Sequence, residues 1–202
     1  MKQVRSTLRL FGYLAATAFI ASTIATHIVR ADLIGQAAPD FTLTNAVTGT
    51  STALGSLKTD KQATVIVFVG VQCPVSNAYN DRYIALANEY SAKGIEFVAI
   101  NSNQNESIEK VANHARQNKF NFPVLKDGDS AVADAYGANH TPEAFVIDSH
   151  GNVVYHGRID DSQDPSMVSS HDLANALDDV LAGKPVSKPE TKAFGCSIKR
   201  HK

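Results

Sequence analysis

The sequence of 202 residues contains only two cysteines, Cys73 and Cys196. Two cysteines are too few for the disulfide framework of a small secreted domain, and they lack the clustering that a structural zinc site needs. The histidines show no metal-ligand spacing either, so we assign no metal and no cofactor. Redox chemistry or inert burial remain as the two interpretations of the thiols.

Basic residues are scarce between residues 32 and 183, where 9 lysines and arginines stand against 19 acidic residues. Residues 1–31 carry four basic residues and no acid, so the remaining chain has a net charge of 15 − 20 = −5. An acidic domain without a basic stripe argues against a nucleic-acid partner. Residues 184–202 reverse the balance, with six basic residues and one glutamate, and we expect this tail to lie against the acidic domain.

Residues 1–31 are typical of a targeting segment. Three basic residues precede an apolar, uncharged run over residues 10–26, and Val29-Arg-Ala31 has the small-x-small pattern of a cleavage site. The run is short for a membrane span, which favours a signal peptide cleaved after Ala31 over the alternative, an uncleaved anchor. Both alternatives predict an extracytoplasmic protein, periplasmic or secreted, with membrane contact only through this leader. Such an oxidising compartment suits a protein with redox-active cysteines.

The rest of the chain is organised around a strand, a turn and a helix. An unbroken β-branched and aromatic run at residues 65–69 predicts a strand buried on both faces, and Gly70 leads from it into a turn. From Val75 the apolar residues recur with helical period, which predicts one helix with Gly94 as its C-cap. Cys73 therefore stands at a helix N-terminus, where unpaired N–H groups and the helix dipole lower a thiol pKa. We predict a reactive thiol there rather than an inert buried one.

The remaining elements alternate between strands and helices. The patterns predict strands at 38–44, 95–100, 122–126, 143–148 and 153–157, and helices at 106–119, 130–137 and 170–183. Residues 45–61 are expected to be a loop. A strand-helix-strand unit with parallel strands leaves Cys73 at the carboxyl edge of the sheet, where open α/β sheets bind ligands. We expect one domain over residues 32–183 and a basic extension over residues 184–202.

Four motifs in this order resemble the thioredoxin-like superfamily, and within it the redoxin branch related to alkyl hydroperoxide reductase and thiol-specific antioxidant proteins. They are Ala38-Pro-Asp-Phe41, Cys73-Pro-Val-Ser76, Thr141-Pro142 before Phe145-Val-Ile-Asp148, and Gly151-Asn-Val-Val-Tyr155. The resemblance implies an α/β thioredoxin-like fold in which helices flank a central mixed β-sheet. It also implies a cis Thr141–Pro142 bond facing Cys73, with Pro74 and Thr141 contacting the substrate, against the alternative of an ordinary trans proline.

Two departures from the parent motifs restrict the chemistry. Ser76 stands where a thioredoxin has the second cysteine of Cys-x-x-Cys, so this turn cannot close its own disulfide. Gly70 and Ile66 stand where the peroxiredoxin motif Pro-x-x-x-Thr-x-x-Cys has its threonine and proline. The chain thus resembles a peroxiredoxin-like redoxin with one active-site thiol. Two roles remain open for Ser76: its hydroxyl binds a backbone N–H at the helix start, or it polarises the Cys73 sulfur.

Cys196 is the candidate for a second thiol. The sequence Gly195-Cys-Ser-Ile-Lys199 resembles a Gly-Cys-x-Ile-Lys ending of the same peroxiredoxin-like group. On an extended basic arm Cys196 would reach Cys73 and resolve a mixed disulfide. The alternative is an unpaired tail cysteine, because a disulfide requires Cα atoms about 4.4–6.8 Å apart and a sequence contains no distances.

The predicted function is an exported thiol oxidoreductase that exchanges disulfides through Cys73, with Cys196 as the resolving thiol. One alternative is a peroxiredoxin-like thiol peroxidase, an antioxidant in which peroxide oxidises Cys73 to sulfenic acid. Another is a non-catalytic binding domain of the same fold. The expected partners are a protein thiol or disulfide, or a small thiol or peroxide. His140, next to Thr141, is interpreted as a solvated loop histidine or as a group that tunes the thiolate.

Overall fold

The computed structural model describes residues 33–200 of the chain, and the predicted signal peptide lies outside them. Within these residues the strands are β1 (Thr42–Asn45), β2 (Ser51–Ala53), β3 (Ala63–Phe68), β4 (Ile95–Asn101), β5 (Val124–Lys126), β6 (His140–Thr141), β7 (Glu143–Asp148), β8 (Val153–Gly157) and β9 (Cys196–Ser197). The helices are α1 (Leu54–Lys58), α2 (Pro74–Asn77), α3 (Asn80–Ser91), α4 (Ile108–Gln117), α5 (Ala131–Tyr136) and α6 (Asp172–Leu181), with a 3₁₀ turn η1 (Pro165–Met167).

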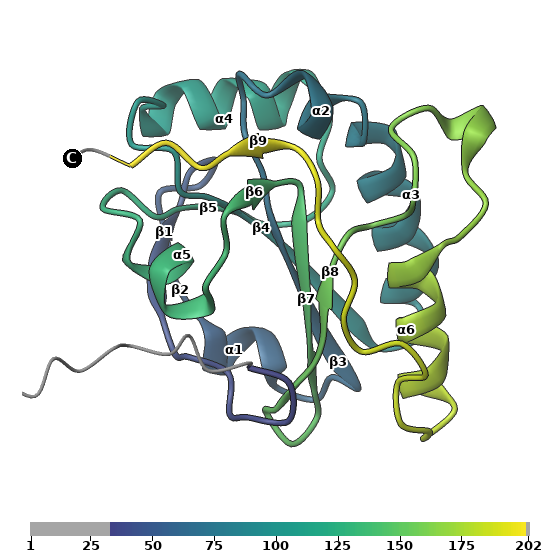
Figure 1. The fold of residues 1–202 in the computed structure, drawn as a ribbon. Helices are drawn as coiled ribbons and strands as arrows, with labels where there is room; N and C mark the ends of the chain where they lie inside the picture. The colour runs from purple at the N-terminus through teal and green to yellow at the C-terminus, as the bar shows by residue number, and fades with distance from the viewer. Residues whose placement is uncertain (1–32, 201–202) are drawn as a thin grey trace, which may run out of the picture.

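A mixed seven-stranded sheet, in the order β2-β1-β5-β4-β3-β7-β8, forms the centre of the molecule (Figure 1). β3 pairs in parallel with β4 and antiparallel with β7, so it is hydrogen-bonded on both sides. Its side chains alternate between two cores, as a strand buried on both faces requires. Val65 and Val67 pack in the core that includes α3, α4 and α6, whereas Ile66 and Phe68 pack in the core that includes α1 and α5. The α/β sandwich places the carboxyl end of β3 beside the start of α2.

The prediction of one continuous helix from Val75 is wrong. The segment forms two helices, α2 and α3, because the Tyr79 N–H bonds to the Ser76 carbonyl three residues earlier and tightens the turn between them. α3 then ends with Ala92 as its C-cap, so Gly94 is not the cap. Gly94 instead adopts φ +83° where the chain enters β4.

Other boundaries also differ from the prediction: the strand expected at 38–44 is β1 (Thr42–Asn45), and the helix expected at 106–119 is α4 (Ile108–Gln117), which Ser107 caps through the Lys110 N–H. The expected loop at residues 45–61 contains β2 and α1, because Leu54 and Leu57 bury their side chains under the sheet. The last helix begins at Asp172 rather than at Ser170, whose hydroxyl donates to the Asp172 carboxylate. The structure confirms the strands predicted at 95–100, 143–148 and 153–157, which are β4, β7 and β8, and the hairpin turn between β7 and β8.

After α6 the chain runs back over the domain as an extended segment, residues 184–200, which we call the strap. Near its end the strap contains β9, which lies beside β6 and pairs with it antiparallel (yellow in Figure 1). Lys188 and Arg200 form ion pairs with Asp172 and Asp134, as the charge asymmetry predicts. No helix among the described residues is long and apolar enough to cross a membrane.

Candidate active site

Cys73 lies between β3 and α2, as the N-cap residue of that short helix. Its side chain is buried, with 4% of the residue exposed. The Ser76 backbone N–H donates to the Cys73 sulfur at 3.2 Å, and the Cys73 thiol in turn donates to the Thr141 carbonyl oxygen at 3.1 Å. The sulfur therefore sits between the first turn of a helix and the strand that precedes Pro142.

The pKa of Cys73 is lowered from its ordinary value. Burial of the thiol raises the pKa, but hydrogen bonds from the Cys196 and Thr141 side chains and from the Ser76 N–H stabilise the thiolate and outweigh burial. The pKa of Cys196 moves upward, first because its thiol is hydrogen-bonded to the Cys73 sulfur. Of the two thiols, Cys73 is the one prepared to act as a nucleophile.

Cys196 comes to Cys73 from the far end of the sequence. In the β6–β9 pair Cys196 lies opposite Thr141, the residue whose carbonyl contacts the Cys73 sulfur. Both cysteines are free thiols, and both line one small cavity of about 90 Å³. The strap thus brings together the two thiols that the sequence separates by more than a hundred positions.

The other predicted site residues lie around this pair. The Thr141–Pro142 bond is cis in the structure, and both residues are buried, whereas Pro74 is exposed at the start of α2. Ser76 is buried, and its hydroxyl accepts the Gly70 N–H at 3.2 Å while only its backbone N–H reaches the sulfur. Of the two roles left open for this hydroxyl, the structure therefore supports the bond to backbone.

His140 contacts the carboxylate of Glu143. Its Nδ1 lies 3.7 Å from the carboxylate of Glu143, with 39% of the side chain exposed. The Glu143 carboxylate also accepts the backbone N–H groups of Asn139 and His140, so it fixes the loop that enters β6. These contacts connect His140 to Glu143, and a role of His140 in tuning the thiolate stays a prediction.

Gly70 is a steric requirement of the site. A Cβ atom at this position would lie 2.9 Å from the Asn103 side-chain nitrogen, 3.0 Å from the Thr141 hydroxyl and 3.1 Å from the Cys73 Cβ. The threonine that a peroxiredoxin has here would not fit without rearrangement. The missing threonine therefore agrees with the packing around Cys73.

Glu106 was expected only as the start of a helix, but it lies before α4 as a buried carboxylate of the site. Glu106 is 1% exposed, and it accepts the backbone N–H groups of Val71 and Gln72, which lead to Cys73. The side-chain amides of Asn101 and Asn103 donate to it as well. Burial raises the pKa of Glu106, but these four hydrogen bonds outweigh it and lower the pKa, so the group is a carboxylate that holds the turn in place.

The sequence contains a signal for Asn101 and Asn103. Asn101 and Asn103 directly follow the second buried strand, and the rule that placed Cys73 at the carboxyl edge of the sheet applies to them equally. Lys126 supports both, because its ammonium group donates to the Asn101 side-chain oxygen at 2.9 Å and to the Asn103 carbonyl at 2.7 Å. Residues 101–106 therefore form a polar support beneath the cysteine turn.

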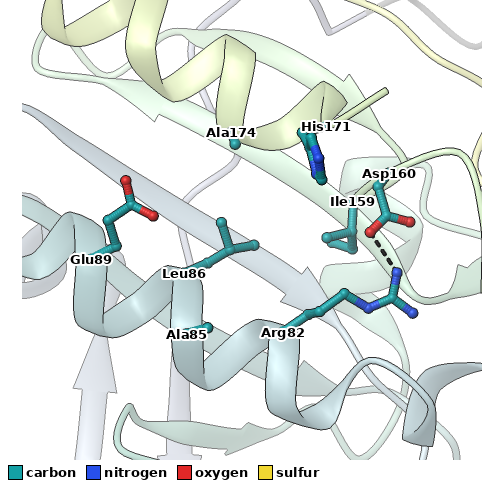
Figure 2. Close-up of a pocket in the computed structure, with 8 residues that line it drawn as sticks. All are labelled: Arg82, Ala85, Leu86, Glu89, Ile159, Asp160, His171 and Ala174. Atoms are coloured by element: carbon teal, nitrogen blue, oxygen red, sulfur yellow. Dashed lines mark hydrogen bonds and ion pairs between the residues drawn. The ribbon is translucent and has the colours of Figure 1, made fainter. Parts of the chain in front are cut away.

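A second cavity, of about 170 Å³, lies between α3 and α6 (Figure 2). Leu86, Ile159 and Ala174 contribute apolar walls, while Arg82 donates to Asp160 at 2.5 Å on one side. Neither cysteine lines this cavity, so it offers no thiol chemistry. Among residues 33–200 no cluster of three or more histidine, cysteine or acidic side chains has an arrangement that would hold a metal ion.

Three curated relatives carry the name thiol-disulfide oxidoreductase ResA, and two of them match over similar lengths. The protein from Halalkalibacterium halodurans is 29% identical over 120 residues, and the protein from Bacillus subtilis is 32% identical over 123 residues. Each alignment covers 59% of this chain, and the chain spans 65% and 64% of the two relatives, slightly less than two thirds of their lengths.

A longer match comes from a crystal structure of an uncharacterized conserved protein from Geobacillus kaustophilus. It is 37% identical, with a TM-score of 0.77, and the alignment covers 83% of this chain and 92% of that one. The AhpC/TSA family matches residues 34–156, which is more than half of the chain. Together with the mixed sheet and the cysteine turn at the end of β3, this match shows that the chain is a member of the AhpC/TSA family with a thioredoxin-like fold.

Proposed function

We propose that this protein is a thiol-disulfide oxidoreductase in which Cys73 is the nucleophile and Cys196 is the resolving thiol. The observation that carries the proposal is the meeting of the two thiols at the β6–β9 pair, where Cys196 lies opposite Thr141, whose carbonyl contacts the Cys73 sulfur, and where both cysteines line one cavity. The name shared by the three curated relatives supports the same class of reaction.

The reaction proceeds in two exchange steps. The Cys73 thiolate attacks one sulfur of a disulfide R–S–S–R, so that a bond forms between Cys73 and that sulfur while the other sulfur leaves as a thiolate. The Cys196 thiol then loses its proton to solvent and attacks the Cys73 sulfur, which expels the second substrate thiolate. The substrate disulfide is reduced to two thiols, and the two protein thiols are oxidised to one disulfide. The same steps in reverse oxidise a substrate dithiol.

The raised pKa of Cys196 suits the order of these steps. The pKa is raised first by the hydrogen bond to Cys73, and that cause disappears when Cys73 has become part of a mixed disulfide. Lys199, whose charge lowers the same pKa, then favours the Cys196 thiolate. The Cys196 thiol therefore ionises less readily in the reduced protein and becomes a better nucleophile after the first step.

Neither alternative function has comparable support. A thiol peroxidase uses a hydroxyl three residues before its cysteine, and the space around Gly70 leaves no room for that side chain. A non-catalytic binding domain has no need of a lowered pKa at Cys73. We further propose that the protein acts outside the cytoplasm on protein thiols or disulfides or small thiols, because residues 1–31 have the pattern of a cleaved signal peptide.

The test follows the mass of the intact chain after the reduced protein is mixed with 2-hydroxyethyl disulfide. The parent chain should lose two hydrogen atoms as the Cys73–Cys196 disulfide forms. The Cys196→Ser chain should instead accumulate one mercaptoethanol adduct, and peptide mapping should place it on Cys73. Cys73→Ser is the matched control, which should react far more slowly because Cys196 lies outside the helix N-terminus whose Ser76 N–H stabilises the Cys73 thiolate.

The result that would contradict the proposal is equal reactivity of the two single-cysteine chains, or an adduct on Cys73 that persists in the parent chain. Sulfenic acid formation on Cys73 with hydrogen peroxide, at a rate above that of the disulfide reaction, would favour the peroxidase alternative instead.

A further inference from the structure

The strap covers the edge of the active site that an incoming chain would use. β6 consists of His140 and Thr141, and both residues are paired with β9. The Ile198 N–H donates to the Asn139 carbonyl, which continues the pairing beyond β9. An exposed strand edge is a ready template for an extended partner segment, and here a segment of the same chain occupies it.

The strap is also clamped from the opposite side. The Lys199 N–H donates to the Asn103 side chain at 2.8 Å, and the Gln104 N–H donates to the Lys199 carbonyl at 2.8 Å. Ile198 is 5% exposed and packs in the core on the α1 and α5 side of the sheet. The strap end is therefore bound like a strand between β6 and the loop after β4.

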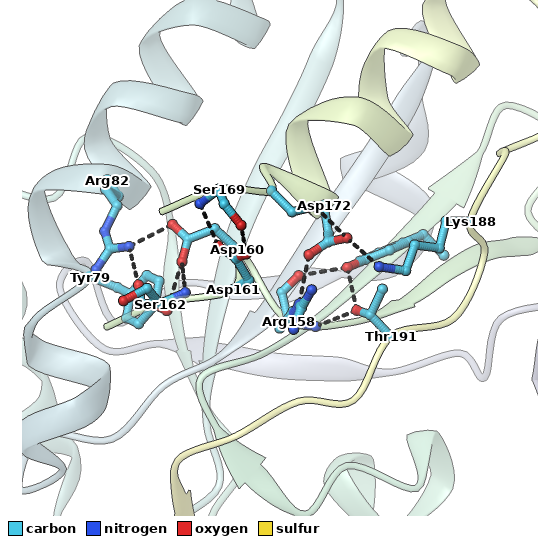
Figure 3. A network of polar contacts seen from close by, with 12 residues as sticks. Tyr79, Arg82, Arg158, Asp160, Asp161, Ser162, Ser169, Asp172, Lys188 and Thr191 are labelled. Carbon is cyan, nitrogen blue, oxygen red and sulfur yellow. Dashed lines mark hydrogen bonds and ion pairs between the residues drawn. The ribbon is translucent and has the colours of Figure 1, made fainter. Parts of the chain in front are cut away.

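Upstream of β9 the strap is anchored to β8 through Thr191. The Thr191 N–H donates to the His156 carbonyl, and the Thr191 hydroxyl bonds to the Tyr155 hydroxyl at 2.7 Å. The same hydroxyl accepts the Arg158 N–H at 3.0 Å (Figure 3). Lys188 adds its ion pair with Asp172. These contacts lie away from the thiols, so the end of the strap can leave β6 while its base stays attached.

Two glycines allow the close approach of strap and domain. A Cβ atom at Gly157 would lie 2.0 Å from the Thr191 hydroxyl, and one at Gly195 would lie 2.1 Å from the Thr141 carbonyl oxygen. Gly195 also has φ +151°, which L side chains rarely adopt. The contact between the strap and Thr141 thus depends on residue 195 being glycine.

The docked strap leaves a small opening at Cys73. The cavity of about 90 Å³ is lined by Gln72, Cys73, Asn103, Asn105, Glu106, Cys196, Ser197 and Lys199. It is well below the roughly 300–1,000 Å³ of pockets that hold drug-sized ligands. A sulfur with a short substituent fits such an opening, but an extended polypeptide would have to pair where β9 already lies.

We propose that the strap sets the substrate class of Cys73: with the strap docked, the thiol reacts with small disulfides, and a cysteine within an extended polypeptide reacts only when β9 leaves β6. This inference rests on the proposed function, since it concerns which disulfides Cys73 attacks. The strap competes with polypeptide substrates for the backbone of Thr141.

The test measures which half of an asymmetric disulfide becomes bonded to Cys73. The probe is a short extended peptide whose central cysteine is joined to 2-mercaptoethanol, and Cys196→Ser keeps the adduct on Cys73 stable for intact mass analysis. The parent strap should give mainly the mercaptoethanol adduct. Gly195→Ala should raise the ratio of peptide adduct to mercaptoethanol adduct about tenfold or more, because alanine is incompatible with this backbone and contact. Gly128→Ala, which has open space around its Cβ, is the matched control and should keep the parent ratio.

A second measurement needs no substitution in the strap beyond Cys196→Ser. Amide hydrogen exchange of residues 196–198 should accelerate in the peptide adduct and stay slow in the mercaptoethanol adduct. A peptide adduct whose strap amides stay protected would overturn the strap proposal and leave the proposed function intact. Failure of Cys73 to take either half of the probe would refute the proposed function itself.

Discussion

The buried carboxylate of Glu106 gives a direct measure of how the cysteine turn is held. Oε1 accepts the Gln72 N–H at 2.8 Å, and Oε2 accepts the Val71 N–H at 3.0 Å and the Asn101 and Asn103 amides at 2.5 and 3.1 Å. In Glu106→Gln the new NH₂ group faces at least one of these donors, and the remaining bonds lose their charge assistance. Hydrogen bonds to charged groups contribute about 1.5–3 kcal/mol each, and the neutral amide is less costly to bury. We expect the free energy of unfolding to fall by about 2–3 kcal/mol.

The pH dependence of this loss distinguishes lost charge from general damage. The pKa of Glu106 lies below its ordinary value of 4.5, so the unfolded chain takes up the proton at a higher pH than the folded chain. The stabilisation is therefore present above the unfolded pKa and is lost as the pH falls through the folded pKa. Urea unfolding under reducing conditions should show the largest gap between parent and Glu106→Gln at neutral pH and a smaller one below about pH 4.

The matched control for Glu106→Gln is Glu89→Gln, whose carboxylate is 57% exposed in a surface ion pair with Lys93. It should change the free energy of unfolding by no more than about 0.5 kcal/mol. A gap for Glu106→Gln that is equally large at pH 3 and pH 7, or no larger than that of the control, would refute the assignment of Glu106 as the group that holds the turn.

Three further substitutions test the site. Cys196→Ala removes the hydrogen bond that lowers the Cys73 pKa most, so the midpoint of the pH dependence of iodoacetamide alkylation should move upward; an unchanged midpoint would show that Cys196 does not stabilise the Cys73 thiolate. Ser76→Cys places a second thiol on the first turn of α2 and should accelerate insulin reduction with dithiothreitol, whereas no gain would show that the turn is not of the thioredoxin kind. Gly70→Ala should lower the free energy of unfolding by about 1–3 kcal/mol in denaturant, because its Cβ would meet three neighbours at about 3 Å, and Gly128→Ala should not.

The fold was predictable where burial alone decides the pattern. Every residue of β3 except Thr64 is apolar because both faces of the strand are covered, and β7 and β8 flank a short Gly-Asn turn, so both signals are local. The helical spacing of apolar residues did not predict the break between α2 and α3, because this spacing continues from Val75 to Tyr90 across the tightened turn at Tyr79. A hydrophobic pattern reports which face is buried, but it does not report a break in the backbone hydrogen bonds.

The candidate site was predictable only in part, for a related reason. Cys73, Ser76 and Thr141-Pro142 stand in short motifs, so residue type and neighbours suffice to find them. Glu106 acts through N–H groups more than thirty positions away, and Gly195 matters because of a carbonyl on another strand. Such contacts depend on tertiary distances. Glu106 stands in no motif, and the motif Gly195-Cys-Ser-Ile-Lys199 does not indicate which carbonyl Gly195 approaches.

In the proposed reaction, the location of the second thiol changes how the two exchange steps relate to each other. In a Cys-x-x-Cys turn the resolving thiol stands one helical turn from the first and is always in place, but here Ser76 fills that position and Cys196 arrives on the strap. A polypeptide substrate needs the strap away from Thr141, whereas resolution needs Cys196 back beside Cys73. The two steps are then necessarily sequential, and the return of β9 both displaces the bound polypeptide and delivers the attacking sulfur. A weaker strap contact accordingly has opposite effects on the two steps, because it accelerates polypeptide attack and slows resolution. A Cys-x-x-Cys protein has no element that would couple entry and release of its substrate in this way.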